Sequence, residues 1–395
     1  MLSLVGSGAT LYRMRALVAL VLVAPTWARA DVSVGASVGA GAQGAATYGA
    51  LDLRLDAAWP SSAIRLGLGA RGVWDDAVFR RGDWDGVGSV VTLVRDFAIA
   101  RDAGDTKLAL AAGALAPSHV GHIVDGYRVA LDDRFRTGVR AAAQREDLDV
   151  VLELDDLLDP ALIAGGVRYA MSPPYSMHLA LGIDPSAPTM AVGTDQTRTI
   201  TAIEAGASRR YEGYLARADV GLSVVAEISL GASAVAFANG AAERWGVMWS
   251  ARADARAGTG TAGSLFGPLY RVERLAHDGR MSLWDRAHAG ETRGAGAGIV
   301  VGAAVPAGWL ELGARVRPGF GGLVTASAGA PMGKWVQAAT WAAIGRDDVA
   351  GAAELRVAWA KQLFSGLQVM RLYRFDAMEP LSLWSVTAWF GAATE

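Results

Sequence analysis

Long runs in which apolar and polar residues alternate constrain the fold of this chain more than any other feature. Within residues 51–59 the odd positions are apolar, and three of the four even positions carry Asp52, Arg54 and Asp56. A repeat of two places successive side chains on opposite faces of a β-strand. Comparable runs occupy residues 64–74, 175–184, 245–256 and 353–359. The sequence therefore predicts an all-β protein built from many two-faced strands.

The length of these segments indicates strands that cross a membrane. They extend over about 9 to 12 residues, and a strand tilted by about 45° needs about 9 to 11 residues to cross the hydrocarbon layer. Indole rings prefer the boundary between headgroups and hydrocarbon, so tryptophans near segment ends predict aromatic girdles. A large soluble β-protein with long strands is the alternative. The girdle candidates are Trp59, Trp74, Trp309, Trp341, Trp384 and Trp389.

The apolar content of the chain does not come from spanning helices. The chain is 52% hydrophobic, but its long uncharged stretches (32–51, 228–242 and 294–310) are rich in Gly, Ala and Ser. Backbone groups in hydrocarbon must all be hydrogen-bonded, so strands cross a membrane only as a closed barrel. At roughly 20 residues for each strand and its connection, we expect a transmembrane antiparallel up-and-down β-barrel of about 18 strands, with a range of 16–20.

The N-terminus predicts export. Arg13 and Arg15 precede the apolar run 16–23, and Ala28-Arg29-Ala30 has the small-x-small form of a signal-peptidase site. These are the three parts of a secretory signal. We therefore expect a signal peptide over 1–30, with Met14 as a possible alternative start, and a single barrel domain over 31–395.

Charge and cysteine content exclude several classes of protein. The 37 basic residues nearly balance the 39 acidic residues, which argues against a nucleic-acid partner. The chain has no cysteine, so disulfides, thiolate metal sites and cysteine nucleophiles are excluded. We expect no cofactor and no metal.

The C-terminal segment carries a family resemblance. Trp384, Val386, Ala388 and Phe390 alternate with Ser385, Thr387 and Trp389. This pattern resembles the terminal β-signal of Gram-negative outer-membrane proteins, although here the tail 391–395 follows the aromatic residue. The resemblance implies a porin-like barrel in the bacterial outer membrane that contacts lipid and is assembled by the barrel-assembly machinery.

The polar faces of the alternating segments predict a charged lumen. An arginine or lysine facing lipid at the bilayer midplane costs about 2–4 kcal/mol, so these charges are expected inside. The leading hypothesis is a non-enzymatic channel for passive diffusion of small hydrophilic solutes. A web of ion pairs that fills the interior is the alternative. The candidates are Asp52, Arg54, Asp56, Arg65, Arg71, Arg252, Asp254, Arg256, Glu354 and Arg356.

Other polar clusters give weaker signals. His119, His122 and Asp125 could converge on a metal or, with Ser118, on nucleophilic chemistry, but a solvated loop is the preferred interpretation. Asp155, Asp156 and Asp159 precede Pro160, and a strand end that enters a turn is their preferred interpretation. Two other functions stay open: an outer-membrane lipid or peptide hydrolase using His119 or His288, and a structural or surface-interaction barrel with a plugged lumen. No catalytic residue is assigned.

Overall fold

A computed structural model gives the structure of the chain. It describes residues 31–59, 61–75, 78–79, 88–115, 117–128, 136–189, 197–261, 265–276, 279–332, 335–375 and 380–394. The expected signal peptide at 1–30 lies outside the described residues.

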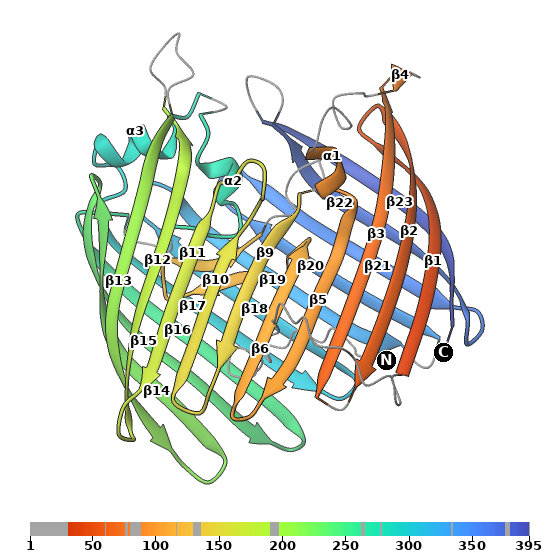
Figure 1. The fold of residues 1–395 in the computed structure, drawn as a ribbon. Coiled ribbons are helices and arrows are strands. Elements are labelled where there is room, and N and C mark those ends of the chain that lie inside the picture. The colour runs from red at the N-terminus through yellow and green to blue at the C-terminus, as the bar shows by residue number, and fades with distance from the viewer. Residues whose placement is uncertain are drawn as a thin grey trace.

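The described strands form one antiparallel sheet that closes on itself (Figure 1). Each of twenty long strands pairs with two neighbours, and the ring closes where β1 pairs with β23, with Val38 opposite Phe390. The two-residue strand β4 adds to β3 at the rim. The barrel strands are β1 (Asp31–Gln43), β2 (Ala46–Trp59), β3 (Ser62–Asp75), β5 (Val94–Ala103), β6 (Thr106–Gly113), β9 (Gly138–Gln144), β10 (Leu148–Leu154), β11 (Ile163–Ala170), β12 (Tyr175–Pro188), β13 (Thr197–Glu212), β14 (Ala216–Ile228), β15 (Gly231–Arg244), β16 (Val247–Gly258), β17 (Gly294–Val305), β18 (Gly308–Arg317), β19 (Gly321–Met332), β20 (Val336–Ile344), β21 (Val349–Ala358), β22 (Leu363–Arg374) and β23 (Leu381–Ala393).

The all-β, antiparallel and closed architecture confirms the predicted fold class, but the estimate of about 18 strands is two too low. Turns such as Gly44-Ala45 and Trp245-Gly246 occupy only two residues, so the spacing per strand is shorter than the assumed 20 residues. Strand β15 is rich in alanine and glycine, which weakens its alternation in hydropathy.

The outer surface of the barrel is apolar. Leu51, Leu53 and Leu55 are exposed on one face of β2, and Leu222 and Val224 on one face of β14. The intervening residues face the interior, as the pleat requires. Half of each strand is therefore apolar because it covers the outside of the barrel, not because it forms a central core.

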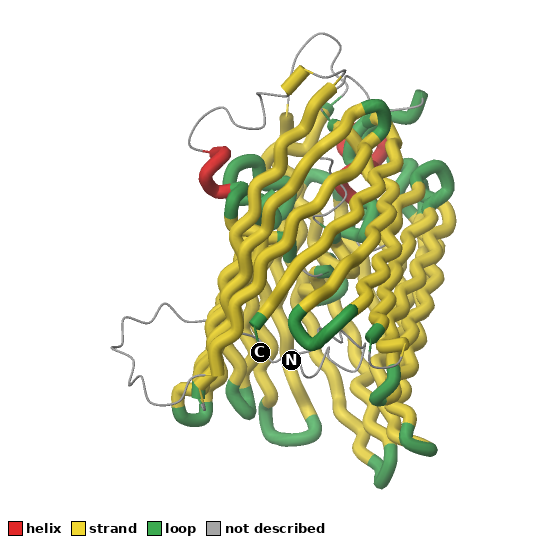
Figure 2. The backbone as a smooth tube through the Cα atoms, turned by 90° about the vertical axis from the view of Figure 1, so that its right-hand side faces the viewer, coloured by secondary structure: helices red, strands yellow, loops and turns green. Residues whose placement is uncertain are grey.

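The two ends of the barrel differ. The short turns after β2, β5, β9, β13 and β15 lie at one end, together with both termini of the described chain, and this is called the short-turn end here (Figures 1 and 2). The longer connections lie at the opposite, long-loop end, which carries the helices α1 (Gly88–Val91), α2 (Tyr270–Glu273) and α3 (Leu283–His288). No helix in the described part of the chain is long and apolar enough to span a membrane.

Two of the long connections fold into the barrel. The connection between β6 and β9 forms a hairpin of β7 (Ser118–Val120) and β8 (Val124–Tyr127), called the inward hairpin here. The connection between β16 and β17 carries α2 and α3, and its Phe266 forms a backbone bridge with Val124 of the inward hairpin. An apolar core forms where both connections pack on the inner wall. Its loop residues include Val120, Ile123, Val124, Tyr127, Leu265, Phe266, Tyr270 and Leu283.

Exposed aromatic side chains gather near the short-turn end. They lie at the ends of strands or in the turns that connect them, where an interfacial girdle is expected. None of them was among the tryptophans expected in the girdles, although Trp245 and Trp249 belong to the alternating run 245–256. They are Tyr169, Tyr175, Tyr211, Tyr214, Trp245, Trp249, Trp335 and Trp359.

The tryptophans expected in the girdles divide between the two faces of the sheet. Trp59, Trp74 and Trp384 share the faces of the exposed apolar residues of β2, β3 and β23. Trp309, Trp341 and Trp389 occupy the opposite, inward faces, where the guanidinium of Arg128 lies 4.0 Å from the Trp341 ring. The inward position of the second group departs from the girdle expectation, because position near a strand end does not determine the face.

The last strand extends through the tail that follows the aromatic residue. Trp384, Val386, Ala388 and Phe390 lie on the outward face of β23. Beyond them, Ala392 and Ala393 pair with Ala36 and Gly35 of β1. The tail therefore contributes to barrel closure, and a role of the outward residues in assembly stays a prediction.

Candidate lumen site and constriction

A cavity of about 1260 Å³ lies inside the barrel. It is bordered at one end by residues of the inward hairpin, including His119 and Asp125, and extends to residues of the short-turn end, including Asp105 and Lys107. Charged side chains of both signs line it. The basic residues are Arg65, Arg95, Lys107, Arg140, Arg145, Arg168, Arg210, Arg217, Arg252 and Arg315, and the acidic residues are Asp96, Asp105, Asp125, Glu146, Asp147, Asp149, Asp219 and Asp254.

The ten lumen candidates occupy the inward positions of their strands. Asp52, Arg54 and Asp56 alternate with exposed leucines on β2, and the candidates on β3, β16 and β21 alternate in the same way with apolar residues. Three of them, Arg65, Arg252 and Asp254, border the cavity described above. A role of these ten residues in solute passage stays a prediction.

Most of these charges are engaged with one another. Asp56 contacts Arg54 at 2.7 Å and Arg65 at 2.9 Å, and Arg65 lies 3.5 Å from Asp96. On the far wall Asp254 bonds Arg256 and Arg315, each at 2.9 Å. The planar guanidinium suits such sites because it holds carboxylates through several donors without losing its charge. The wall is thus a network of mixed sign.

Asp125 attaches the inward hairpin to the wall opposite its origin. Its carboxylate accepts hydrogen bonds from Arg315 on β18 and from Arg252 on β16, and lies 2.8 Å from His119 Nδ1. In the strand order β18 is as far from β6 as the barrel allows, in either direction round the ring. The hairpin leaves the wall at β6 and therefore reaches across the lumen. Burial alone would raise the pKa of the Asp125 carboxyl, but Arg315 and Arg252 hold it well below its ordinary value.

Two buried aspartates hold both inward connections. Asp155, in the loop after β10, accepts hydrogen bonds from Tyr127 of the inward hairpin and from Arg271 of α2, the latter at 2.9 Å. Asp184 of β12 accepts from Tyr270 at 2.7 Å and from Arg274 at 2.8 Å. Burial raises the pKa of both tyrosines well above the ordinary value, so they stay protonated donors.

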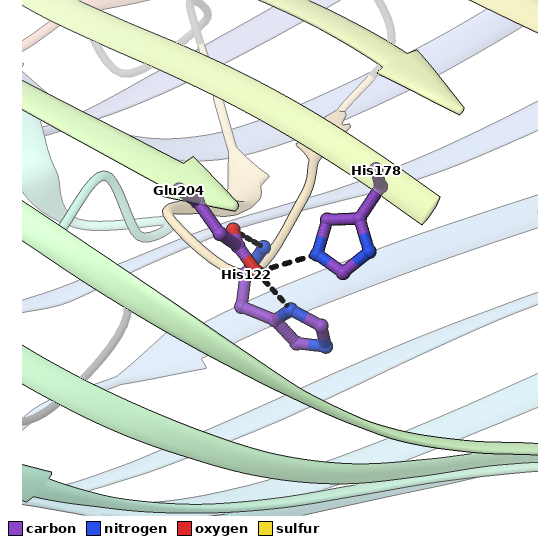
Figure 3. Close-up of side chains that lie close together, drawn as sticks. All are labelled: His122, His178 and Glu204. Atoms are coloured by element: carbon purple, nitrogen blue, oxygen red, sulfur yellow. Dashed lines mark hydrogen bonds and ion pairs between the residues drawn. The ribbon is translucent and has the colours of Figure 1, made fainter. Parts of the chain in front are cut away.

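A third attachment joins the tip of the inward hairpin to the wall through Glu204 of β13 (Figure 3). The fully buried carboxylate lies 2.6 Å from His122 Nδ1 and 3.0 Å from His178 Nε2, and it accepts the backbone N–H of His122 at 2.6 Å. Gly121 has a φ of +56°, and a Cβ at this position would overlap Glu204 Oε2. A glycine is therefore required for this close approach.

The histidines of the hairpin are thus not the solvated loop residues that the sequence favoured. The structure brings His119 to Asp125 and separates it from His122, which joins His178 and Glu204 instead. The sequence could not predict this arrangement, because His122 lies 82 residues and His178 lies 26 residues from Glu204. The spacing of residues within the loop therefore does not indicate the contact.

The other polar clusters have structural partners. Ser282 caps α3 and donates to Asp285, while His288 Nδ1 lies 2.9 Å from the Trp284 carbonyl oxygen. Ser118 bonds Glu153, which also pairs with Arg140. Within the described residues, no serine hydroxyl is hydrogen-bonded to a histidine ring.

Several residues that hold the two inward connections were not identified as site residues from the sequence. Glu204 and Asp184 sit in strands whose other residues alternate normally, and Arg271 and Arg274 lie in a connection with no recognisable motif. Glu204 and Asp184 could have been found as charged residues at inward positions of their strands. The second pair depends on the path of a loop, which alternation does not describe.

No protein-family model and no curated protein sequence matches this chain. Among solved structures, it is similar to OccK2 (OpdF) of Pseudomonas aeruginosa, with 10% identity, a TM-score of 0.38, and coverage of 92% of this chain and 98% of that chain. It is also similar to P. aeruginosa OpdK with vanillate, with 9% identity, a TM-score of 0.34, and coverage of 92% of this chain and 98% of that chain. For a BenF-like porin from Pseudomonas fluorescens Pf-5 the corresponding values are 8%, 0.35, 93% and 99%. The architecture of this chain is established by its own strand pairings.

Proposed function

We propose that this chain is a bacterial outer-membrane channel through which small hydrophilic solutes diffuse passively. The observation that carries the proposal is a cavity lined with charges inside a closed barrel whose outer face is apolar. An apolar exterior suits lipid, and a closed sheet leaves no unpaired strand edge there. A polar interior of this size suits water and dissolved solutes.

The asymmetry of the barrel gives the channel an orientation. Outer-membrane barrels place short turns on the periplasmic side and long loops outside. Solutes would then enter at the long-loop end, pass the inward hairpin and reach the charged cavity. Because the cavity carries both signs, it would favour small polar or zwitterionic molecules over apolar ones of equal size. The outward C-terminal residues would be recognised by the barrel-assembly machinery. The apolar outer face would contact the surrounding lipid.

A plugged barrel is the second candidate, because one observation favours it. The inward connections form a continuous apolar core with the wall, including the buried Tyr127, Phe266 and Tyr270. Such packing would hold the connections in place instead of leaving a free passage. The hydrolase alternative has less support, since Ser282 and Asp285 form the N-terminal cap of α3 and His288 Nδ1 lies 2.9 Å from the Trp284 carbonyl oxygen of the same helix.

Solute flux distinguishes an open channel from a plugged one. Purified barrel is reconstituted into vesicles, and swelling is followed in isotonic solutions of an amino acid, a monosaccharide and a trisaccharide. The channel proposal expects rapid entry of the smallest solute and slow entry of the largest. Folded barrel in vesicles that swell no faster than empty vesicles would support the plug.

A further inference from the structure

The cluster of His122, His178 and Glu204 contains the donor atoms of a metal site. One ligand atom from each residue lies within 4.8 Å of the other two. The donors come from three separate parts of the barrel, namely the tip of the inward hairpin, β12 and β13 (Figure 3). Two imidazoles and one carboxylate form the ligand set of a common class of zinc site, in which the fourth position stays open.

Glu204 differs in its partners from the other buried carboxylates that hold the inward connections. A buried charge is ordinarily paired with an opposite charge or bound to a metal. Asp155, Asp184 and Asp125 each contact at least one arginine. The side chain of Glu204 is 0% exposed, yet its partners are two imidazoles and a backbone N–H. The two imidazole nitrogens beside this carboxylate are ligand atoms that a divalent cation would share with it.

The geometry lies close to that of a metal centre. Metal–nitrogen bonds of about 2.0–2.1 Å and metal–oxygen bonds of about 2.0–2.2 Å place tetrahedral ligand atoms roughly 3.3 Å apart. The two nitrogens lie 2.6 Å and 3.0 Å from Glu204 Oε1, so each N–O separation is within about 1 Å of the tetrahedral value, and the two nitrogens lie within 4.8 Å of each other. His122 and His178 both border the cavity, which gives an ion a route to the site.

A buried hydroxyl beside the cluster supports the same conclusion. Ser223 of β14 is 4% exposed, and its Oγ has no hydrogen-bond partner. It lies next to the cluster, because a Cβ on Gly206 would overlap the His178 ring and contact Ser223 Cβ. A water molecule in the open coordination position could satisfy this hydroxyl, since buried polar groups are rarely left unpaired.

We propose that His122, His178 and Glu204 bind one divalent transition-metal ion of the Zn²⁺ class. The bound ion ties the tip of the inward hairpin to strands β12 and β13, and so fixes the hairpin across the lumen. Imidazole and carboxylate ligands favour such an ion over Ca²⁺ or Mg²⁺, which prefer oxygen ligands only. The proposal does not depend on solute passage, because ion binding is measured directly.

The test is a titration of the full, folded barrel in detergent after removal of metal with a chelator. Co²⁺ serves as the probe, because its visible absorption reports a four-coordinate site, and Zn²⁺ should displace it. We expect one equivalent to bind with a dissociation constant in the micromolar range or below. His178→Gln and Glu204→Gln should each weaken binding by roughly 100-fold, at or above the 10–100-fold loss typical of outer-shell partners.

Two matched variants separate this site from other histidines. His288→Gln alters an exposed histidine on α3, and His119→Gln alters the other histidine of the inward hairpin. Both should bind Co²⁺ within a few-fold of the wild type. Absence of saturable binding to the folded wild-type barrel would overturn the proposal, as would wild-type affinity in both His178→Gln and Glu204→Gln. The first result needs no variant and so does not depend on how the variants fold.

Discussion

Arg315 on the barrel wall donates a hydrogen bond to Asp125 of the inward hairpin, although 190 residues separate the two in sequence. Arg252 reaches the same carboxylate at 3.1 Å. Because β18 lies opposite β6 in the strand order, this contact ends a span that crosses the barrel. The position of the hairpin across the barrel therefore depends on a few polar contacts at its end.

Replacing Arg315 with Gln should loosen the inward hairpin. A hydrogen bond to a charged group contributes about 1.5–3 kcal/mol, and Asp125 would keep only part of its compensation. We expect a larger and noisier single-channel conductance than in the wild type, with the barrel still folded. Arg244→Gln is the control, since this exposed arginine at the end of β15 lies 4.3 Å from the Trp245 ring at the short-turn end and is not among the residues that line the cavity. Equal conductance in Arg315→Gln and wild type would show that Arg315 does not hold the hairpin.

Acidification should release the same contact. The folded-state pKa of Asp125 is depressed, so its ion pairs stabilise the hairpin above the unfolded value of about 3.9 and are lost as the pH falls through the lower folded value. Conductance should be steady from pH 8 to about pH 4 and rise only at lower pH, as the Asp125 carboxylate becomes protonated. Asp125→Asn should lack this acid-dependent rise. An identical acid response in wild type and Asp125→Asn would exclude Asp125 as its source.

Gly121→Ala should displace the tip of the hairpin. The residue has a positive φ, which costs about 1–2 kcal/mol for other residues, and the added Cβ would also overlap Glu204. Gly104→Ala is a matched control, because Gly104 has a φ of +62° but no atom within 4 Å of its added Cβ. We expect Gly121→Ala to be cleaved faster by protease within the hairpin, whereas Gly104→Ala should resemble the wild type. Equal cleavage of the two variants would argue against the close approach to Glu204.

A charge on the outer face should destabilise the barrel according to its depth. Leu222, at the middle of β14, is 68% exposed, whereas Leu215 lies in the turn before that strand. Leu222→Arg should lower the free energy of unfolding in lipid by about 2–4 kcal/mol, and Leu215→Arg by about 0–1 kcal/mol. Denaturant titration of barrels refolded into vesicles measures both. Equal losses at the two positions would contradict the assigned membrane depth.

The architecture could be predicted from the sequence because a strand between lipid and water has a strict repeat of two. Leu51, Leu53 and Leu55 mark the outer face of β2 as clearly in the sequence as in the structure. The number of strands was harder to predict, because two-residue turns shorten the spacing per strand and β15 carries many alanines and glycines whose hydropathy hardly alternates. The face of a lone aromatic residue was also uncertain, as Trp341 shows.

The contacts that hold the inward connections in the barrel could not be predicted, because they form between segments far apart in sequence. His122 occurs in a polar connection, and nothing in that connection indicates that it folds into the lumen toward Glu204. The same holds for Asp155, which joins Tyr127 and Arg271 from different connections. Such contacts depend on the path of the loops within the barrel, and a local pattern contains no information about that path.

Planar-bilayer recording of the purified, refolded barrel tests the central claim most directly. The channel account predicts discrete conductance steps of uniform size in potassium chloride. The steps should persist in lipids without added partners, and they should grow in Arg315→Gln but not in Arg244→Gln. Folded wild-type barrel that inserts into the bilayer yet gives no conductance steps in any salt would contradict an open, water-filled lumen.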